Sequence, residues 1–159
     1  MKVTLENVLP SEIERRSFEI ITQELGDREL DPEQAPVIKR VIHTSADFEY
    51  VDTLCFSEHV IEKALDAIRN GASIVTDTQM GRSGINKKCL AGYGGQVYCF
   101  MGDEDVAEAA RKNGTTRAAA SIDKAARMDG PLIFAVGNAP TALVRLYELI
   151  QDGVLSPAL

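Results

Sequence analysis

Arg40 and His43 are the two residues of this chain whose types and spacing best suit chemistry. The imidazole of histidine has a pKa near neutrality, so His43 can both donate and accept a proton. A spacing of three places both side chains on one face of a helix, where the arginine can hold a ligand carboxylate, with Thr44 beside them. The alternative is a core histidine that is hydrogen-bonded to a carbonyl, with Arg40 solvated.

Composition excludes several classes of function. The 159 residues, 45% hydrophobic and 26% charged, predict one globular domain with a real core. The net charge of -7 argues against general nucleic-acid binding, although a local cluster of arginines can still bind an anion. The three cysteines have no CxxC spacing, so we expect free thiols, a reducing compartment and no metal site. Short apolar runs and the lack of a signal peptide predict a cytoplasmic protein without membrane partners.

The first predicted helix carries a hydroxyl on its apolar side. Residues 10–12 open this helix, with Ser11 as N-cap, and Gly26 ends it. The helical period places Ser17 on a mostly apolar face. Ser17 therefore either eases close helix packing or points its hydroxyl into a pocket.

The second predicted helix places His43 at its end. It begins at Asp31-Pro32, or only at Pro36, and runs to about His43. A short strand over residues 52–56 and a helix over 58–70, capped by the preceding serine, are predicted next.

Strands alternate with helices through the rest of the chain. Apolar runs predict strands over residues 72–77, 97–101 and 131–136, each followed by a helical pattern or a polar loop. This alternation predicts an α/β fold, a single domain with a mostly parallel sheet and helices on both faces. Ligands of such sheets usually bind at the carboxyl ends of the strands.

Two side chains follow the first of these strands. Asp77 can either accept a ligand donor and orient a partner or cap the next turn, and the sequence does not decide between these. The glycine-rich stretch 78–84 is predicted to be a loop at a ligand site. Met80 in this loop is either a ligand contact or a packing residue.

Two further segments favour an anionic ligand. Thr116 and Arg117 open a predicted helix, where hydroxyl, N–H and guanidinium groups can bind an anion, although Thr116 can also be a simple N-cap. Gly137 and Asn138 link the last strand to a helix and can bring backbone N–H groups close to a ligand. The chain has neither a GxxxxGK[ST] nor a GxGxxG motif.

Five stretches, in this order, resemble the precorrin-8X methylmutase family of cobalamin biosynthesis, also called cobalt-precorrin-8 methylmutase. They are Arg16-Ser17-Phe18-x-Ile-Ile, Arg40-Val-Ile-His43, Ile74-Val-Thr-Asp77-x-x-Met80, Thr116-Arg117 and Gly137-Asn-Ala-Pro-Thr-Ala-Leu143. The resemblance covers nearly the whole chain. The stretch Arg40-Val-Ile-His43 together with the stretch Gly137–Leu143 is fairly specific, and either of them alone is weak.

The resemblance implies an isomerase that moves a methyl group from C11 to C12 of a corrin-type macrocycle. It implies that the residue matching His43 donates and recovers a proton, which eases a [1,5]-sigmatropic shift without a cofactor or a methyl donor. The implied substrate carries many carboxylates, and the implied assembly is a homodimer. The substrate-binding residues implied by the match and by the strand-end argument are Ser17, Arg40, Thr44, Asp77, Met80, Thr116, Arg117, Gly137 and Asn138.

The sequence departs from the family at its end, where members usually continue into another strand. The chain is therefore either a shortened piece of a longer protein or a naturally short relative, and in both cases we expect an open sheet edge and an incomplete pocket. A non-catalytic corrinoid or tetrapyrrole binder is the alternative function, and an enzyme for a phosphate or carboxylate metabolite is a third. The residues give no signal for an axial ligand, so they do not say whether the macrocycle carries cobalt.

Overall fold

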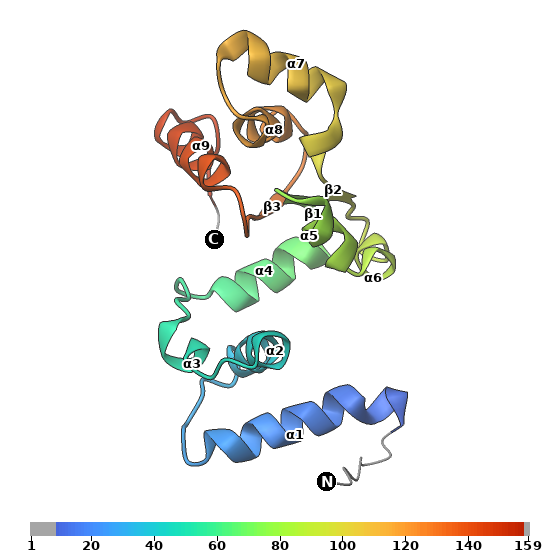
Figure 1. Ribbon diagram of the computed structural model, residues 1–159, viewed down its shortest axis with the longest axis vertical. Helices are drawn as coiled ribbons and strands as arrows, with labels where there is room; N and C mark the ends of the chain where they lie inside the picture. The colour runs from blue at the N-terminus through green and yellow to red at the C-terminus, as the bar shows by residue number, and fades with distance from the viewer. Residues whose placement is uncertain (1–8, 158–159) are drawn as a thin grey trace, which may run out of the picture. The chain divides into compact units, whose positions relative to one another are not determined.

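The computed structural model describes residues 9–157 (Figure 1). The chain divides into two compact units, Met1–Ser57 and Glu58–Leu159. The predicted α/β class with a parallel sheet is confirmed, whereas the single-domain organisation over residues 1–159 stays a prediction. Within the described part, no helix has both the length and the apolar composition needed to cross a bilayer.

The N-terminal unit is helical where it is described. Its elements are a 3-10 turn η1 (Pro10–Glu12) and the helices α1 (Ile13–Leu25), α2 (Ala35–Ser45) and α3 (Tyr50–Thr53). Apolar side chains at helical spacing form one buried cluster between α1 and α2. That cluster contains Ile21, Leu25, Ile38 and Ile42.

Helix ends in this unit differ in part from the predictions. Ser11 makes no capping hydrogen bond, because a 3-10 turn precedes α1, but Gly26 ends that helix with φ 59° as predicted. The second helix begins only at Ala35. Asp31 instead accepts the N–H groups of Glu33 at 2.9 Å and Gln34 at 3.2 Å, which forms a turn before the helix.

The strand predicted over residues 52–56 is wrong. Tyr50–Thr53 form the short helix α3, and Asp47 accepts the Glu49 N–H at 2.9 Å just before it. Tyr50, Val51 and Leu54 pack against the α1–α2 cluster. Their spacing of one and then three residues suits a helical turn, so tertiary packing overrides the strand-like local pattern.

The C-terminal unit contains a parallel sheet of three strands in the order β2-β1-β3 among the described residues. Its elements are α4 (Val60–Arg69), β1 (Ser73–Thr76), α5 (Gln79–Gly84), α6 (Lys87–Ala91), β2 (Val97–Tyr98), η2 (Phe100–Gly102), α7 (Glu104–Asn113), α8 (Arg117–Ala125), β3 (Leu132–Ala135) and α9 (Pro140–Gln151). In the central strand, Val75 lies opposite Tyr98 of β2 and Phe134 of β3. The carboxyl ends of all three strands therefore meet at one edge of the sheet.

Helices α7, α8 and α9 pack together within this unit, as Figure 1 shows. Helix α8 contacts both of its neighbours, and most of its buried residues are alanines, which allow close approach. Side chains of α8 and α9 form a second buried cluster, against which Phe134 of β3 packs. These contacts fix the starts of α8 and α9 relative to the end of β3.

Three local predictions for this unit need correction. Helix α4 begins at Val60, with His59 at its N-cap position in a left-handed conformation (φ 57°), so the serine at 57 does not cap it. Residues 79–84 form helix α5 rather than a loop, because the Thr78 hydroxyl accepts the Gly81 N–H at 3.0 Å. Strand β2 has only two residues, because the chain turns into η2 directly after Cys99.

One glycine is required by a close approach of two backbone segments. A Cβ atom on Gly95 would lie 2.2 Å from the carbonyl oxygen of Ala72. Ala72 precedes β1, and Gly95 comes two residues before β2. Because Gly95 has no side chain, the segments that lead into β1 and β2 can lie directly side by side.

An apolar cavity of about 690 Å³ lies beside β3. Residues of β3, α4 and α9 and the segment after α9 line it, including Ile133, Phe134, Leu146, Ile150 and Leu155. Since β3 pairs only with β1 among the described strands, it is an edge strand of this sheet.

Candidate active site

The predicted site residues divide between the two units. Four of them, Ser17, Arg40, His43 and Thr44, belong to α1 and α2 of the N-terminal unit. The other six lie at or just beyond the carboxyl edge of the sheet in the C-terminal unit, and they are Asp77, Met80, Thr116, Arg117, Gly137 and Asn138.

Phe18 of α1 brings Arg40 and His43 together. The guanidinium carbon of Arg40 lies 5.0 Å from the centroid of the Phe18 ring, a distance at which a cation and an aromatic face attract each other. The His43 ring meets the same phenylalanine edge-on, with centroids 5.9 Å apart and planes at 74°. The prediction that Arg40 and His43 share one face of their helix is therefore confirmed.

His43 lies in the last turn of α2 with its ring half-buried. Among residues 9–157, neither of its ring nitrogens has a hydrogen-bond partner, although the ring contacts Phe18. A core histidine bonded to a carbonyl would show such a partner, so the structure favours the first of the two sequence interpretations. An imidazole in this state can exchange a proton with a ligand.

Glu14 forms an ion pair with Arg40, and sequence reasoning missed it. The hydrogen bond and the positive charge of Arg40 hold the pKa of the Glu14 carboxyl below its usual range, with a smaller contribution from His43. The same hydrogen bond raises the pKa of Arg40. Glu14 lies four residues before Phe18, which is the spacing of helical neighbours, and this was the available signal.

Ser17 and Thr44 differ in how their hydroxyls are used. Ser17 is half-buried next to Phe18, and its hydroxyl makes no hydrogen bond within the described residues. Thr44 is exposed and donates to the Val41 carbonyl at 2.9 Å, a bond typical of threonine in a helix. Of these two hydroxyls, only that of Ser17 has no hydrogen-bond partner among residues 9–157.

Asp77 is the most strongly bonded of the predicted site residues. Its carboxylate accepts backbone N–H groups from Gly137 at 3.2 Å, Asn138 at 2.7 Å and Ala139 at 2.7 Å. Burial alone would raise the pKa of this carboxyl, but the three donors outweigh it and hold the pKa below its usual range. Asp77 therefore joins the end of β1 to the end of β3.

This carboxylate changes the expected role of the loop at residues 137–139. The sequence predicted that the N–H groups of Gly137 and Asn138 approach a ligand anion, and that expectation is wrong for these N–H groups, because Asp77 already occupies them. The alternative that Asp77 caps the next turn is also wrong, since Thr78 does so. What remains for a ligand at this loop is the Asn138 side chain, which is exposed.

Thr116 and Arg117 begin helix α8. The Thr116 hydroxyl accepts the Ala119 N–H at 3.1 Å, so the N-cap role of this threonine is confirmed. The same hydroxyl lies 2.8 Å from that of Thr141, in the first turn of α9, so the starts of α8 and α9 meet. Arg117 is exposed and makes no ion pair within the described part of the chain.

Met80 is 85% exposed on α5, so it is not a packing residue of this unit. The side chain of the preceding Gln79 donates to the Cys99 carbonyl at 3.4 Å, which ties α5 to the end of β2. Met80 therefore projects from a helix that is fixed to the sheet, and its predicted ligand contact stays a prediction.

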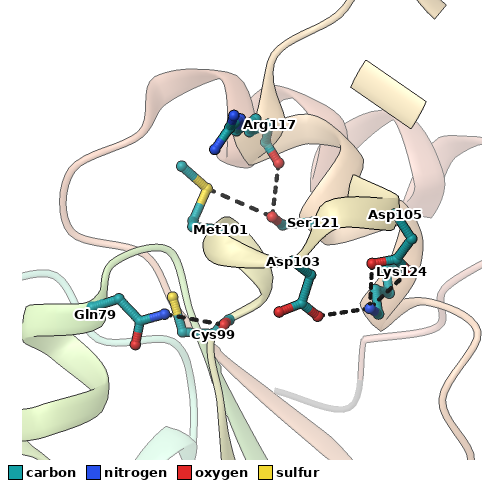
Figure 2. A network of polar contacts seen from close by, with 8 residues as sticks. All are labelled: Gln79, Cys99, Met101, Asp103, Asp105, Arg117, Ser121 and Lys124. Carbon is teal, nitrogen blue, oxygen red and sulfur yellow. Dashed lines mark hydrogen bonds and ion pairs between the residues drawn. The ribbon is translucent and has the colours of Figure 1, made fainter. Parts of the chain in front are cut away.

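A network of polar contacts connects helix α8 with the segment before α7 (Figure 2). Ser121 donates to the Arg117 carbonyl at 2.7 Å and lies 3.5 Å from the Met101 sulfur. Lys124 bonds Asp103 at 2.7 Å and Asp105 at 2.9 Å, and these hydrogen bonds raise the pKa of Lys124. The network fixes α8 against η2 and the start of α7.

The described residues contain no group of three or more His, Cys, Asp or Glu side chains arranged to hold a metal ion. The chemistry that the described side chains can themselves perform differs between the two units. In the N-terminal unit this is proton transfer beside a cation, and in the C-terminal unit it is the binding of anions by Arg117 and by hydroxyls at helix starts.

Comparison with known proteins bears on the same residues. The family model described as precorrin-8X methylmutase (CbiC) matches residues 12–159. The chain belongs to the precorrin-8X methylmutase family. The match runs through both units and includes every predicted site residue.

Relatives and solved structures agree with this family. A cobalt-precorrin-8 methylmutase of Priestia megaterium is 44% identical over 152 residues, which are 96% of this chain and 68% of the relative. A cobalt-precorrin-8 methylmutase of Salmonella typhimurium is 44% identical over 145 residues, 87% of this chain and 69% of that protein. A solved precorrin-8X methyl mutase of Thermus thermophilus superposes with a TM-score of 0.78 at 39% identity, covering 90% of this chain and 69% of the solved chain.

Proposed function

We propose that this protein is an isomerase of cobalamin biosynthesis that moves a methyl group from C11 to C12 of precorrin-8 or its cobalt complex. The observation that carries the proposal is the half-buried His43 ring, which has no hydrogen-bond partner in the described residues and lies beside Arg40 in a chain of this family. Family membership supplies the reaction, and the position of His43 beside Arg40 supports its proposed role as the proton donor.

In the proposed mechanism, His43 in its protonated form donates a proton to the conjugated macrocycle. Protonation makes the π system electron-poor, so the methyl group can migrate with its bonding electrons from C11 to C12. The proton then returns to the same nitrogen of His43. Because the methyl group stays within one molecule and the proton is recovered, substrate and product have the same formula, and no oxidant or methyl donor is consumed.

The binding residues recognise the charge of the substrate. Its peripheral carboxylates suit Arg40 and Arg117, since a guanidinium group can bond a carboxylate through two parallel N–H donors. The free Ser17 hydroxyl and the exposed Asn138 amide add neutral hydrogen bonds. We also propose, as in the sequence analysis, a homodimer and a cytoplasmic location; sedimentation of the purified protein and fractionation of cells test these two points.

The chain has two histidines, so His59 can serve as a matched control for a test of His43. His43→Ala should lower turnover of precorrin-8 by about 10²- to 10⁴-fold, the range that one general acid–base contributes. The affinity for the product cobyrinic acid should change by less than about threefold, since the proposal assigns the carboxylates of the macrocycle to Arg40 and Arg117 rather than to His43.

The matched control is His59→Ala, because His59 is exposed at the start of α4 and lies near the carboxylates of Glu58 and Glu62. Its turnover should equal that of the wild type. If His43→Ala turned over precorrin-8 at the wild-type rate, the proposed mechanism would be refuted. Tight corrinoid binding by a wild-type protein that shows no turnover would instead identify a non-catalytic binder.

A further inference from the structure

Glu14 contacts the N-terminal site residues, but the proposed function gives it no role. It lies on α1 and reaches across to Arg40 of α2, with which it forms an ion pair and a hydrogen bond. Arg40 is the arginine that the proposal assigns to a substrate carboxylate. A carboxylate of the protein therefore already occupies the guanidinium that the substrate needs.

The ion pair between Glu14 and Arg40 is exposed to solvent and uses only part of the guanidinium group, unlike a buried ion pair. One terminal nitrogen of Arg40 bonds Glu14, and the other N–H donors of its guanidinium have no partner among residues 9–157. Both side chains are about half exposed, Arg40 at 50% and Glu14 at 57%. Ion pairs this exposed are weak and exchange readily with solutes.

Phe18 holds Arg40 independently of Glu14. The phenylalanine ring lies 5.0 Å from the guanidinium carbon, and Phe18 packs on the buried cluster between α1 and α2. When the Glu14 carboxylate leaves, the contact with the Phe18 ring still holds the guanidinium group. Arg40 can thus exchange one carboxylate for another without losing its position.

We propose that Glu14 is an internal competitor for Arg40, which holds the guanidinium in the free protein and is displaced by a carboxylate of the substrate. Glu14 thereby weakens binding of carboxylate ligands at this position and favours a substrate that can offer two oxygens to the fork of Arg40 over one that offers a single acceptor. This inference rests on the proposed function at one point, namely that Arg40 receives a substrate carboxylate.

The test uses the full chain and the product analogue cobyrinic acid, with binding followed by visible absorbance. Glu14→Gln keeps the shape of the side chain and removes its charge. It should tighten binding by about two- to fivefold, the factor to which the strength of an exposed ion pair corresponds. The matched control is Glu12→Gln, which makes the same change of net charge near the start of the same helix but at a carboxylate paired with Arg15.

Two comparisons separate competition from other roles of Glu14. The gain should vanish when Glu14→Gln is combined with Arg40→Ala, and it should be absent with the heptamethyl ester of cobyrinic acid, which carries no carboxylates. Weaker or unchanged binding of cobyrinic acid by Glu14→Gln would overturn the inference, because Glu14 would then position Arg40 or have no effect. A gain that persists without Arg40, or one that Glu12→Gln reproduces, would overturn it as well.

A second probe distinguishes failure of this inference from failure of the proposed function. Citrate is a simple polycarboxylate, and its binding at Arg40 can be followed by the NMR signal of the arginine Nε–H group. In one outcome, no variant binds cobyrinic acid, while Glu14→Gln shifts the citrate titration of Arg40 to lower concentrations. That result would support the competitor role of Glu14 and refute the proposed corrinoid function. If the citrate titration does not shift, the competitor role falls on its own.

Discussion

Replacement of Asp77 by asparagine tests the link between the ends of β1 and β3. In the wild type, one carboxylate oxygen accepts the N–H groups of Asn138 and Ala139, both at 2.7 Å, and the other accepts that of Gly137 at 3.2 Å. Asp77 is only 7% exposed, so water cannot easily take the place of a lost partner. Asp77→Asn keeps the shape of the side chain and removes the charge.

The expected loss in the free energy of unfolding follows from the hydrogen bonds that Asp77→Asn weakens or removes. The amide oxygen of asparagine can still accept the two short bonds, but as a neutral acceptor it bonds more weakly than a carboxylate. Its NH₂ group would face the Gly137 N–H, donor against donor, and leave that N–H unsatisfied. Hydrogen bonds to charged groups contribute about 1.5–3 kcal/mol each, so we expect Asp77→Asn to lower the free energy of unfolding by about 2–4 kcal/mol.

Urea denaturation measures the loss of stability, and hydrogen exchange of the amides at 137–139 locates it. The control is Asp66→Asn, a carboxylate with 57% side-chain exposure that pairs only with Arg69 on its own helix, for which we expect a change below about 0.5 kcal/mol. A loss for Asp77→Asn as small as that of the control, with unchanged exchange at 137–139, would refute the reasoning.

The pH dependence gives an independent check of the same carboxylate. The folded pKa of Asp77 lies below its ordinary value of 3.8, so the unfolded state binds its proton first as the pH falls. The stability that Asp77 contributes is thus fully present above pH 3.8 and is lost between that value and the lower folded pKa. We expect the stability difference between wild type and Asp77→Asn to be constant at neutral pH and to shrink in acid below this value.

Three further predictions concern packing and helix starts. Gly95→Ala should lower the free energy of unfolding by about 2–4 kcal/mol in urea denaturation, because its Cβ would collide with a backbone oxygen, whereas Gly137→Ala, whose Cβ would meet nothing within 4 Å, should cost little. Ile42→Ala should cost about 2–5 kcal/mol by the same measurement, since its side chain is 1% exposed in the α1–α2 cluster. Thr116→Val should cost about 1 kcal/mol and speed hydrogen exchange at Ala119, because the N-cap acceptor of α8 is lost; unchanged exchange would show that the cap does not matter.

The sequence predicts well those parts of the site that depend on local periodicity. Arg40 and His43 lie three residues apart, and helical geometry alone puts them on one face, where Phe18 contacts both. The N-cap role of Thr116 likewise depends on residues within the same turn. The parallel sheet follows from the alternation of strands with helices, which is a pattern of the whole chain.

Contacts between distant residues are what the sequence does not reveal. The N–H groups that Asp77 accepts lie 60 to 62 residues further along the chain, and they come within reach only because β1 pairs with β3. No local pattern distinguishes this use of the carboxylate from ligand binding. The strand predicted over residues 52–56 is wrong for the same reason, since packing against α1 and α2 favours the helix Tyr50–Thr53.

Among the described strands, β3 is paired on one side only, and this has a practical consequence for handling the protein. An edge strand offers a row of free backbone donors and acceptors, and here an apolar hollow with the side chains of Ile133, Phe134 and Leu155 lies directly beside it. Such an edge is a template on which a strand of another molecule can be added. We therefore expect concentrated solutions to become turbid as strand-rich aggregates form. The substitution Ile133→Lys should prevent this turbidity, because a charged side chain on an edge strand disfavours the addition of another strand.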